Sequence, residues 1–106
     1  MEIKEMSHDD WKVLALTDRL DTQTAPELET KGLSLLEGNP KIALDFAELQ
    51  YISSAGLRVL LLLAKKAKAA GGSVVLTGVD GMVKEVIEES GIDAFFTIYD
   101  TVESLP

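Results

Sequence analysis

The fold is decided by one stretch of the chain, KIALDFAELQYISSAGLRVLLLLAKKAKAAGG, which covers residues 41–72. Its first part, Lys41–Phe46, is short and mostly apolar, which is typical of a buried strand in a sheet. A segment rich in Leu and Ala then runs from about Ser54 to Ala70 and stops at two glycines, as expected of a helix. With residues 47–53 as a connecting loop, the stretch predicts a strand followed by a long helix.

Three lysines lie near the end of this predicted helix, at Lys65, Lys66 and Lys68. Cations in the last turns of a helix interact favourably with its dipole. We therefore interpret this cluster as structural and not as a binding patch.

The residues before this stretch predict a hairpin. Apolar and charged residues alternate over Met1–Met6, as in a half-buried edge strand, and a second strand is expected over Trp11–Leu16. The polar link Ser7–Asp10 is short enough for a tight connection. The first two strands should therefore pair in an antiparallel manner.

A first helix is predicted between the hairpin and the central strand. Thr24 and Glu27 have the spacing of a capping box, in which Thr24 is the N-cap. The helix should run to about Glu37 and stop at the Gly-Asn-Pro sequence of residues 38–40.

The residues after Gly72 predict a strand over Ser73–Thr77 and a helix that is capped by Asp80 and followed by Gly91. A last strand over Phe95–Ile98 and a short helix from Asp100 complete the pattern. This order predicts an α/β fold with a single mixed sheet of four to five strands, in which an N-terminal antiparallel hairpin precedes parallel β-α units and helices cover the sheet. We expect residues 1–106 to form one domain.

Charge and composition argue against several classes of protein. The chain has 18 acidic and 10 basic residues, for a formal net charge of -8, whereas nucleic acids and anionic membranes are bound through Lys and Arg. Its longest apolar run, Val59–Ala64, falls far short of the ~20 residues of a membrane span, and the N-terminus lacks the apolar region of a signal peptide. Cysteine is absent, which suits a reducing compartment. We expect a cytoplasmic protein that binds neither nucleic acid nor membrane.

The sequence lacks the residue patterns that common enzyme active sites require. The only histidine, His8, falls in the polar turn, and the serines at 53 and 54 lack both the G-x-S-x-G spacing and a histidine that follows them. The nucleotide-binding motifs G-x-x-x-x-G-K-[ST] and G-x-G-x-x-G are both absent. No spacing of His and carboxylate residues suggests a metal site. We therefore expect no catalytic activity, no metal and no cofactor.

Ser54 opens the long helix, so it is the predicted N-cap, with a hydroxyl that accepts from the backbone N–H of Leu57 or its neighbour. A helix N-terminus also tolerates phosphate well, because its N–H groups are free and its dipole is positive there. Phosphorylation would add about -1.5 to -2 charges and would repel a partner that carries carboxylates. Ser54 is thus either a helix cap alone or a phosphorylation switch.

Residues 44–60 resemble the signature of the STAS domain family, the anti-sigma factor antagonists, and residues 18–25 resemble the family's other marked loop. The predicted order of strands and helices agrees with that fold. The resemblance implies that Ser54, two residues before Gly56, is the phosphorylated serine, with Ser53 as a second candidate. It also implies that Asp21 is a loop acid close to that serine.

The same resemblance implies the partners. The unphosphorylated form would bind an anti-sigma factor with serine kinase activity and so free the sigma factor, and a partner phosphatase would reset the phosphorylated form. Arg58, four residues after Ser54, can pair with a phosphate or with a partner's carboxylate. We expect a monomer that forms hetero-complexes. The expected partner-binding residues are Asp21, Thr22, Tyr51, Ser53, Ser54, Ala55, Gly56 and Arg58.

Two alternatives stay open. The chain can be a constitutive STAS scaffold in another signalling complex, with Ser54 only a helix cap. It can also be an aspartyl-phosphate receiver with Asp45 as acceptor, but receivers begin with a parallel β-α-β unit and carry an acidic pair after their first strand. The predicted N-terminal hairpin, together with the separation of Asp18 from Asp21, disfavours a receiver.

Overall fold

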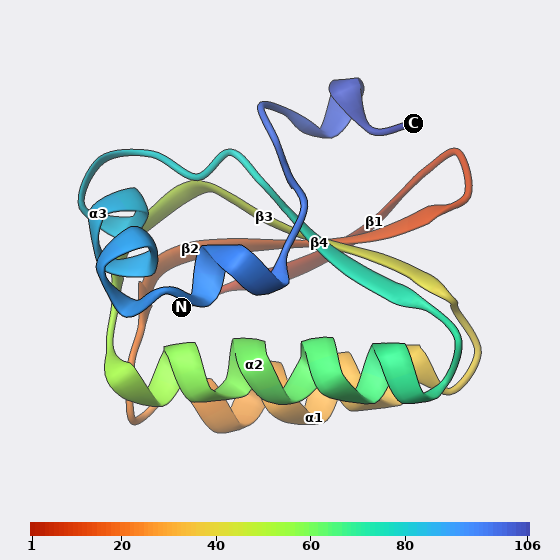
Figure 1. The fold of residues 1–106 in the computed structure, drawn as a ribbon, viewed down its shortest axis with the longest axis horizontal. Helices are drawn as coiled ribbons and strands as arrows, with labels where there is room; N and C mark the ends of the chain where they lie inside the picture. The colour runs from red at the N-terminus through yellow and green to blue at the C-terminus, as the bar shows by residue number, and fades with distance from the viewer.

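The computed structural model describes residues 1–106, which build a five-stranded mixed sheet in the order β1-β2-β3-β4-β5. Strands β1 (Ile3–His8) and β2 (Trp11–Leu20) form an antiparallel hairpin. Strands β3 (Lys41–Ile52), β4 (Ser73–Thr77) and β5 (Ile98–Tyr99) then follow, each parallel to the strand before it (Figure 1). The predicted mixed α/β fold is confirmed, with five strands.

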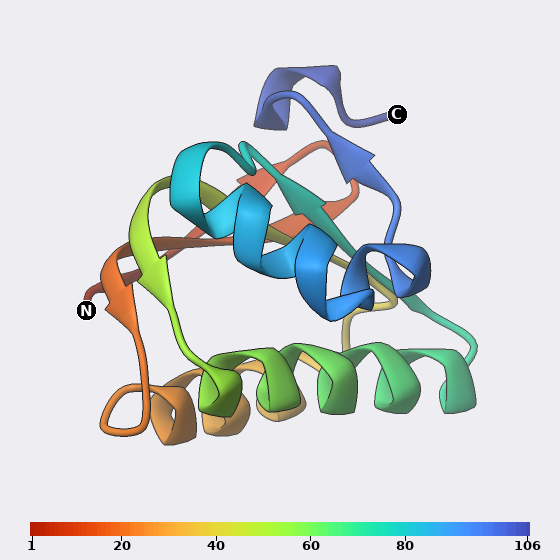
Figure 2. The same ribbon diagram turned by 60° about the vertical axis from the view of Figure 1, so that its left-hand side comes forward.

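Helices α1 (Ala25–Leu36) and α2 (Ser54–Ala69) lie side by side against one face of this sheet (Figures 1 and 2). Helix α3 (Gly81–Ser90) adds buried side chains to the same apolar cluster. Two 3-10 turns follow, η1 (Ile92–Phe95) and η2 (Val102–Ser104). None of the helices has both the length and the apolar character that crossing a membrane requires.

The main core lies between the sheet and the helices. Helix α2 contributes a stripe of buried side chains at helical spacing, among them Val59, Leu60 and Leu63. Helix α1 packs closely against α2 at the buried Gly32, where a β-carbon would lie only 2.7 Å from a methyl carbon of Leu63. The small residue therefore sets how near the two helices approach one another.

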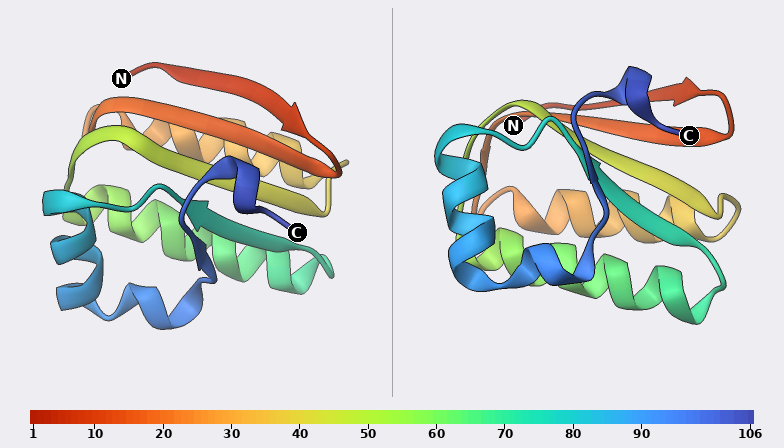
Figure 3. Two further views of the ribbon diagram at one scale, coloured as in Figure 1. Left: turned by 90° about the horizontal axis from the view of Figure 1, so that it is seen from above. Right: turned by 45° about the horizontal axis from the view of Figure 1, so that its top comes forward.

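A smaller core covers the opposite face of the sheet. Trp11, Val13, Ala43 and Val75 form an apolar cluster with Leu105, and the C-terminal segment crosses this face (Figure 3). The indole N–H of Trp11 donates to the backbone carbonyl oxygen of Pro106 at 3.0 Å. This contact ties the end of the chain to the second strand.

Two strands extend well beyond their predicted ends. β2 reaches Leu20, past the predicted end at Leu16, and β3 reaches Ile52, so the predicted loop over residues 47–53 was wrong. These extensions mix polar residues with the buried Leu20, Leu49 and Ile52, and their backbones keep pairing in parallel as far as Leu20 and Ile52, with two register shifts on the way. Asp18, between the shifts, has a φ of 68°, a left-handed conformation that aspartate tolerates better than most residues.

The last strand was also placed wrongly. Phe95 belongs to η1, and only Ile98–Tyr99 pairs with β4. The left-handed Gly91 ends α3, and the chain then turns tightly, with the Phe96 N–H donating to the Asp93 carbonyl oxygen at 3.2 Å. This turn keeps Phe95 in a 3-10 conformation, so it is not extended and does not pair with β4.

The core assignment predicts unequal effects for neighbouring leucines of α2. Leu60 has no exposed surface, so Leu60→Ala should lower the free energy of unfolding by about 2–5 kcal/mol. Leu62 is only half-buried, and Leu62→Ala should lower it by roughly 1 kcal/mol. Urea denaturation of both variants tests the expectation, and equal losses would contradict the orientation of α2.

Candidate functional site

The predicted site residues gather where β2 and β3 end. Leu20 and Ile52 pair at the carboxyl ends of these parallel strands, and Asp21 and Ser53 follow them directly. The backbone N–H of Ser53 donates to the carbonyl oxygen of Leu20 at 2.9 Å. The turn before α1 and the start of α2 consequently lie side by side (Figures 1 and 2).

Ser53, not Ser54, is the N-cap of α2. Ser53 has an extended backbone (φ -100°, ψ 175°), and its hydroxyl oxygen accepts from the backbone N–H of Gly56 at 3.4 Å. The prediction that Ser54 caps the helix was wrong by one residue. The cause is the hydrogen bond to Leu20, which holds Ser53 extended and makes Ser54 the first helical residue.

Ser54 is exposed at the first position of α2, and its hydroxyl makes no hydrogen bond within the protein. The first N–H groups of a helix lack partners inside it, and the N-terminus of α2 carries the positive end of a 16-residue helix. Ser54 therefore places a free hydroxyl at a point that favours negative charge.

Asp21 organises the neighbouring turn. Its Oδ1 accepts from the backbone N–H groups of Gln23 at 3.0 Å and Thr24 at 3.2 Å. The Thr24 hydroxyl accepts from the Asp21 N–H at 2.8 Å and donates to the Arg19 carbonyl oxygen at 2.9 Å. The predicted capping box of Thr24 and Glu27 was thus wrong: Thr24 makes no side-chain cap bond, because its hydroxyl is used inside this turn.

These contacts set the charge state of Asp21, whose side chain keeps 27% of its surface exposed. Partial burial disfavours the charged form and raises the pKa. The backbone N–H groups of Thr24 and Gln23, then the Thr24 hydroxyl and the Arg19 guanidinium, outweigh it, so the pKa of Asp21 is lowered overall. Asp21 therefore stays ionised to a lower pH than an ordinary aspartate, at the same edge of the sheet as the two serines.

Arg19 also belongs to this site, although it was not among the residues predicted from the sequence. Its guanidinium carbon lies 4.2 Å from the centre of the Tyr51 ring, and its Nε lies 3.6 Å from Asp21 Oδ2. Arg19 and Tyr51 are partners in the β2–β3 pairing, so the register of the two strands brings them together. Only a prediction of that register from the sequence could have found the contact.

The other predicted residues differ in exposure. Thr22 is exposed in the turn, and Arg58 is exposed on α2 with no ion pair. Ala55 is half-buried and packs against the main core. Gly56 is buried, and a β-carbon there would lie 2.8 Å from Leu20 Cγ and 3.0 Å from the Leu20 carbonyl oxygen. Gly56 thus allows α2 to approach the end of β2.

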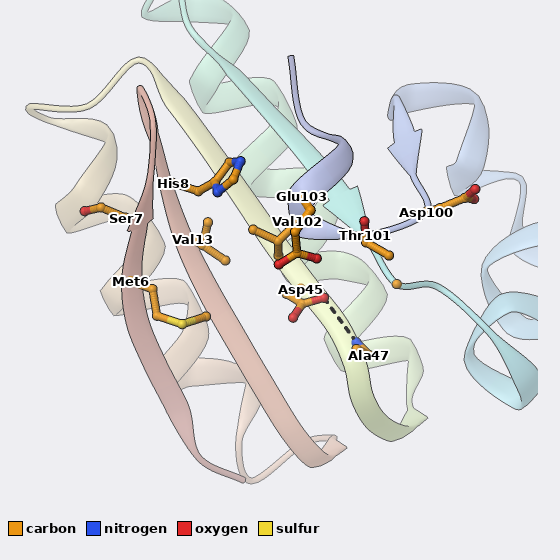
Figure 4. A pocket seen from close by; sticks show the side chains of 11 residues that line it. Met6, Ser7, His8, Val13, Asp45, Ala47, Asp100, Thr101, Val102 and Glu103 are labelled. Carbon is orange, nitrogen blue, oxygen red and sulfur yellow. Dashed lines mark hydrogen bonds between the residues drawn. The ribbon is translucent and has the colours of Figure 1, made fainter.

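A separate cavity of about 350 Å³ opens on the opposite face of the sheet, with His8, Asp45 and Glu103 among its lining residues (Figure 4). Asp45 Oδ1 accepts from the Thr77 hydroxyl at 2.9 Å and from the Ala47 N–H at 3.3 Å. Asp45, the acceptor in the receiver alternative, lines this cavity, but none of the site residues that the STAS resemblance implies does. The antiparallel β1–β2 hairpin also contradicts the receiver alternative, which requires a parallel start.

The site contains a free hydroxyl, a carboxylate and an arginine stacked on tyrosine, but no histidine that could activate the serine, because His8 lies in β1. No group of three or more His, Cys, Asp or Glu residues is arranged to hold a metal ion. The arrangement is suited to presenting charged and hydroxyl groups to another molecule.

The STAS domain model matches residues 2–105, which is nearly the whole described fold. The chain belongs to the STAS domain family. This STAS domain is 34% identical over 93 residues to BtrV of Bordetella bronchiseptica, which is named as an anti-sigma factor antagonist. The match covers 87% of this chain and 80% of BtrV.

Solved structures share the fold of this STAS domain. A Thermotoga maritima protein that is also named as an anti-sigma factor antagonist has a TM-score of 0.87 at 24% identity, over 95% of this chain and 88% of that chain. SpoIIAA of Bacillus, in its phosphorylated form, has a TM-score of 0.75 at 19% identity, over 96% and 94% of the two chains. At these identities the likeness concerns the fold.

The close approach at Gly56 generates one prediction. Alanine is normally better than glycine inside a helix by about 1 kcal/mol, yet Gly56→Ala in this STAS domain should lower the free energy of unfolding by about 1–3 kcal/mol because its β-carbon meets the end of β2. Gly38→Ala is the control, since nothing lies within 4 Å of the added carbon and the change should stay within about 0.5 kcal/mol. A Gly56→Ala protein as stable as the wild type in urea denaturation would rule out the close approach.

The lowered pKa of Asp21 predicts a pH-dependent difference between the wild type and Asp21→Asn. The carboxylate contributes stability that is fully present above its ordinary pKa of 3.8 and is lost as the pH falls through the lower pKa of the folded state. The wild type should be the more stable protein in urea at about pH 7. The difference between the two proteins in free energy of unfolding should shrink towards about pH 2.5. A gap that is the same at both pH values would show that the charge of Asp21 contributes nothing.

Proposed function

We propose that this STAS domain is an anti-sigma factor antagonist with a phosphorylation switch at Ser54. Its unphosphorylated form binds an anti-sigma factor that has serine kinase activity and thereby releases a sigma factor, and phosphorylation of Ser54 prevents that binding. The observation that carries the proposal is the division between the adjacent serines. The Ser53 hydroxyl is held as the N-cap, whereas the Ser54 hydroxyl is exposed and free.

The named relatives support this proposal. BtrV carries the name of an anti-sigma factor antagonist, and SpoIIAA, which shares the fold, has been solved in both an unphosphorylated and a phosphorylated form. In this chain the exposed Ser54 offers an acceptor for such a modification, with Ser53 as the less accessible second candidate. A partner phosphatase would reverse the modification.

The electrostatics of the site favour a change of surface charge over a change of fold. A phosphate on Ser54 would lie at the positive end of α2 and add about -1.5 to -2 charges, so the helix tolerates it. It would add negative charge at the same edge of the sheet as Asp21 and would repel an acidic partner. A hundredfold loss of affinity needs only about 2.7 kcal/mol, and like charges at an interface can cost several kcal/mol.

The proposed binding surface consists of the turn after β2 and the start of α2. Asp21 and the Arg19–Tyr51 pair form one side of it, and Ser54 with the exposed Arg58 forms the other. The catalytic steps of the switch belong to the partners, since the site has no base to activate its own serine. This protein would act in the cytoplasm as a monomer that forms hetero-complexes. The other proposed contact residues are Thr22, Ser53, Ala55 and Gly56.

Mass spectrometry of the protein recovered from its native cells tests the switch. We expect one phosphate on the peptide that contains residues 53 and 54, present in the wild type and in Ser53→Ala but absent from Ser54→Ala. Ser53→Ala is the matched control, because it removes the adjacent hydroxyl and loses only the cap. A phosphate that disappears only in Ser53→Ala would overturn the assignment of the acceptor.

Affinity capture from the same cells extends this test to binding. Unmodified protein should retain an anti-sigma factor that has a kinase domain, and Ser54→Asp should lose most of it while unfolding at the same temperature or above, because an acidic residue suits a helix N-terminus. Equal retention by both proteins would contradict the switch and favour a constitutive scaffold.

A further inference from the structure

A second surface lies at the other end of α2, and we call it the edge groove. It runs between Ala64, Lys65 and Lys68 of α2, the start of β4, and the η1 segment, with a volume of about 550 Å³. Figure 2 shows η1 lying above the C-terminal half of α2. Lys65 is eleven residues after Ser54, or roughly 16 Å along the helix at 1.5 Å per residue, so the edge groove is distinct from the site at the start of α2.

The edge groove borders an unpaired piece of strand at the start of β4. β5 pairs only with Leu76 and Thr77, where the Leu76 N–H donates to the Thr97 carbonyl oxygen at 3.1 Å. Residues two apart in a strand direct their backbone groups to the same side, so Val74 points its N–H and C=O towards the side that β5 occupies further on. No backbone hydrogen bond joins Val74 to Thr97 or to η1. The first half of β4 therefore has an open edge.

An aromatic side chain borders this open edge. Phe95 lines the edge groove and keeps 61% of its surface exposed, which makes it the most exposed of the large apolar side chains. Val74 and Val75, on the other side of the groove, are buried. In strand addition the backbone of the sheet edge supplies the hydrogen bonds, and an exposed aromatic ring beside that edge supplies an apolar contact of the kind enriched in interfaces.

The charge of the edge groove differs from that of the rest of the protein. Lys65 and Lys68 line it, Lys66 lies between them in the chain, and none of the three has a carboxylate within 4.0 Å. The lysines suit the end of the helix dipole, as expected from the sequence, but they also border a groove. On a chain of net charge -8, an acidic segment is attracted here and repelled by most of the remaining surface.

We propose that the edge groove binds an extended, acidic segment of a partner protein, which adds as a strand beside the open edge of β4. Acidic side chains of that segment pair with Lys65 and Lys68, and an apolar side chain packs on Phe95. A second copy of this chain is disfavoured as occupant, because each copy carries the same net charge of -8.

The test uses nuclear magnetic resonance of the full chain, labelled with ¹⁵N, and a defined probe peptide, acetyl-Glu-Val-Glu-Val-Glu-Val-amide. We expect saturable shifts of the backbone amides of Val74, Phe95 and Thr97, and slower hydrogen exchange at Val74. The control peptide, in which Lys replaces each Glu, should produce no saturable shifts at these residues. No saturable shifts with the acidic peptide, or equal shifts with both peptides, would overturn the proposal.

Matched variants test the role of charge. The double variant Lys65→Glu with Lys68→Glu should weaken binding of the acidic peptide by about tenfold, which corresponds to about 1.4 kcal/mol. The control variant Lys4→Glu with Lys84→Glu makes the same change of net charge on exposed residues away from the groove and should weaken binding much less. Equal weakening by both would show that only net charge acts and would overturn the proposal.

A third variant and a dilution series complete the test. Phe95→Ser should also weaken binding of the acidic peptide. Because Phe95 is exposed, the unfolding temperature of this variant should stay close to that of the wild type. Unchanged affinity for the acidic peptide in Phe95→Ser would overturn the proposed contact between Phe95 and the bound segment. Shifts of Val74 and Thr97 that depend on protein concentration without peptide would assign the edge groove to a second copy, against the proposal.

Discussion

Strands β2 and β3 pair in parallel as far as Leu20 and Ile52, and the arrangement of the site depends on this pairing. Parallel strands end at the same edge of a sheet, so the turn after β2 and the helix after β3 must begin next to one another. The Ser53 N–H continues the pairing by one hydrogen bond to Leu20, and the absence of a side chain at Gly56 lets α2 approach that carbonyl. The same register stacks Arg19 on Tyr51.

The two ends of α2 have opposite chemical character. The N-terminal end is positive by virtue of its backbone and lies beside Asp21, whose charge is held by hydrogen bonds in its own turn. The C-terminal end is negative by virtue of its backbone, and unpaired lysines compensate for it. Between these ends the helix is anchored by Leu60 and Leu63, so both surfaces are held on one rigid element.

Much of the fold could be predicted from the sequence. The hairpin, the helices and their order follow from apolar periodicity and glycine stops, and the family resemblance is carried by residues that lie at the site. The strand ends could not be predicted, because Thr17, Asp18 and Arg19 have polar side chains, Asp18 has a left-handed backbone, and pairing with β3 continues past them only with two register shifts. Phe95 belongs to an apolar run like that of a strand, but the turn after Gly91 takes it into η1.

The local details of the site were harder to predict than the elements. Ser53 and Ser54 are equally suitable N-cap residues by type, and a hydrogen bond to a residue far away in the sequence decides between them. Thr24 has the right spacing for a capping box, but Asp21 competes for its hydroxyl and N–H. In the first case a backbone hydrogen bond holds Ser53 extended, and in the second a side chain that could cap a helix bonds to its neighbours in a turn instead.

The different roles of Ser53 and Ser54 imply different phenotypes for mutations at the two codons. Loss of the Ser53 hydroxyl weakens the start of α2, so an allele at codon 53 would be a temperature-sensitive one, tolerated in the cold and defective in the heat. Loss of the Ser54 hydroxyl removes no bond within the protein, so an allele at codon 54 would leave the amount of protein unchanged at every temperature. Neighbouring codons would thus give separable phenotypes, one of abundance and one of regulation.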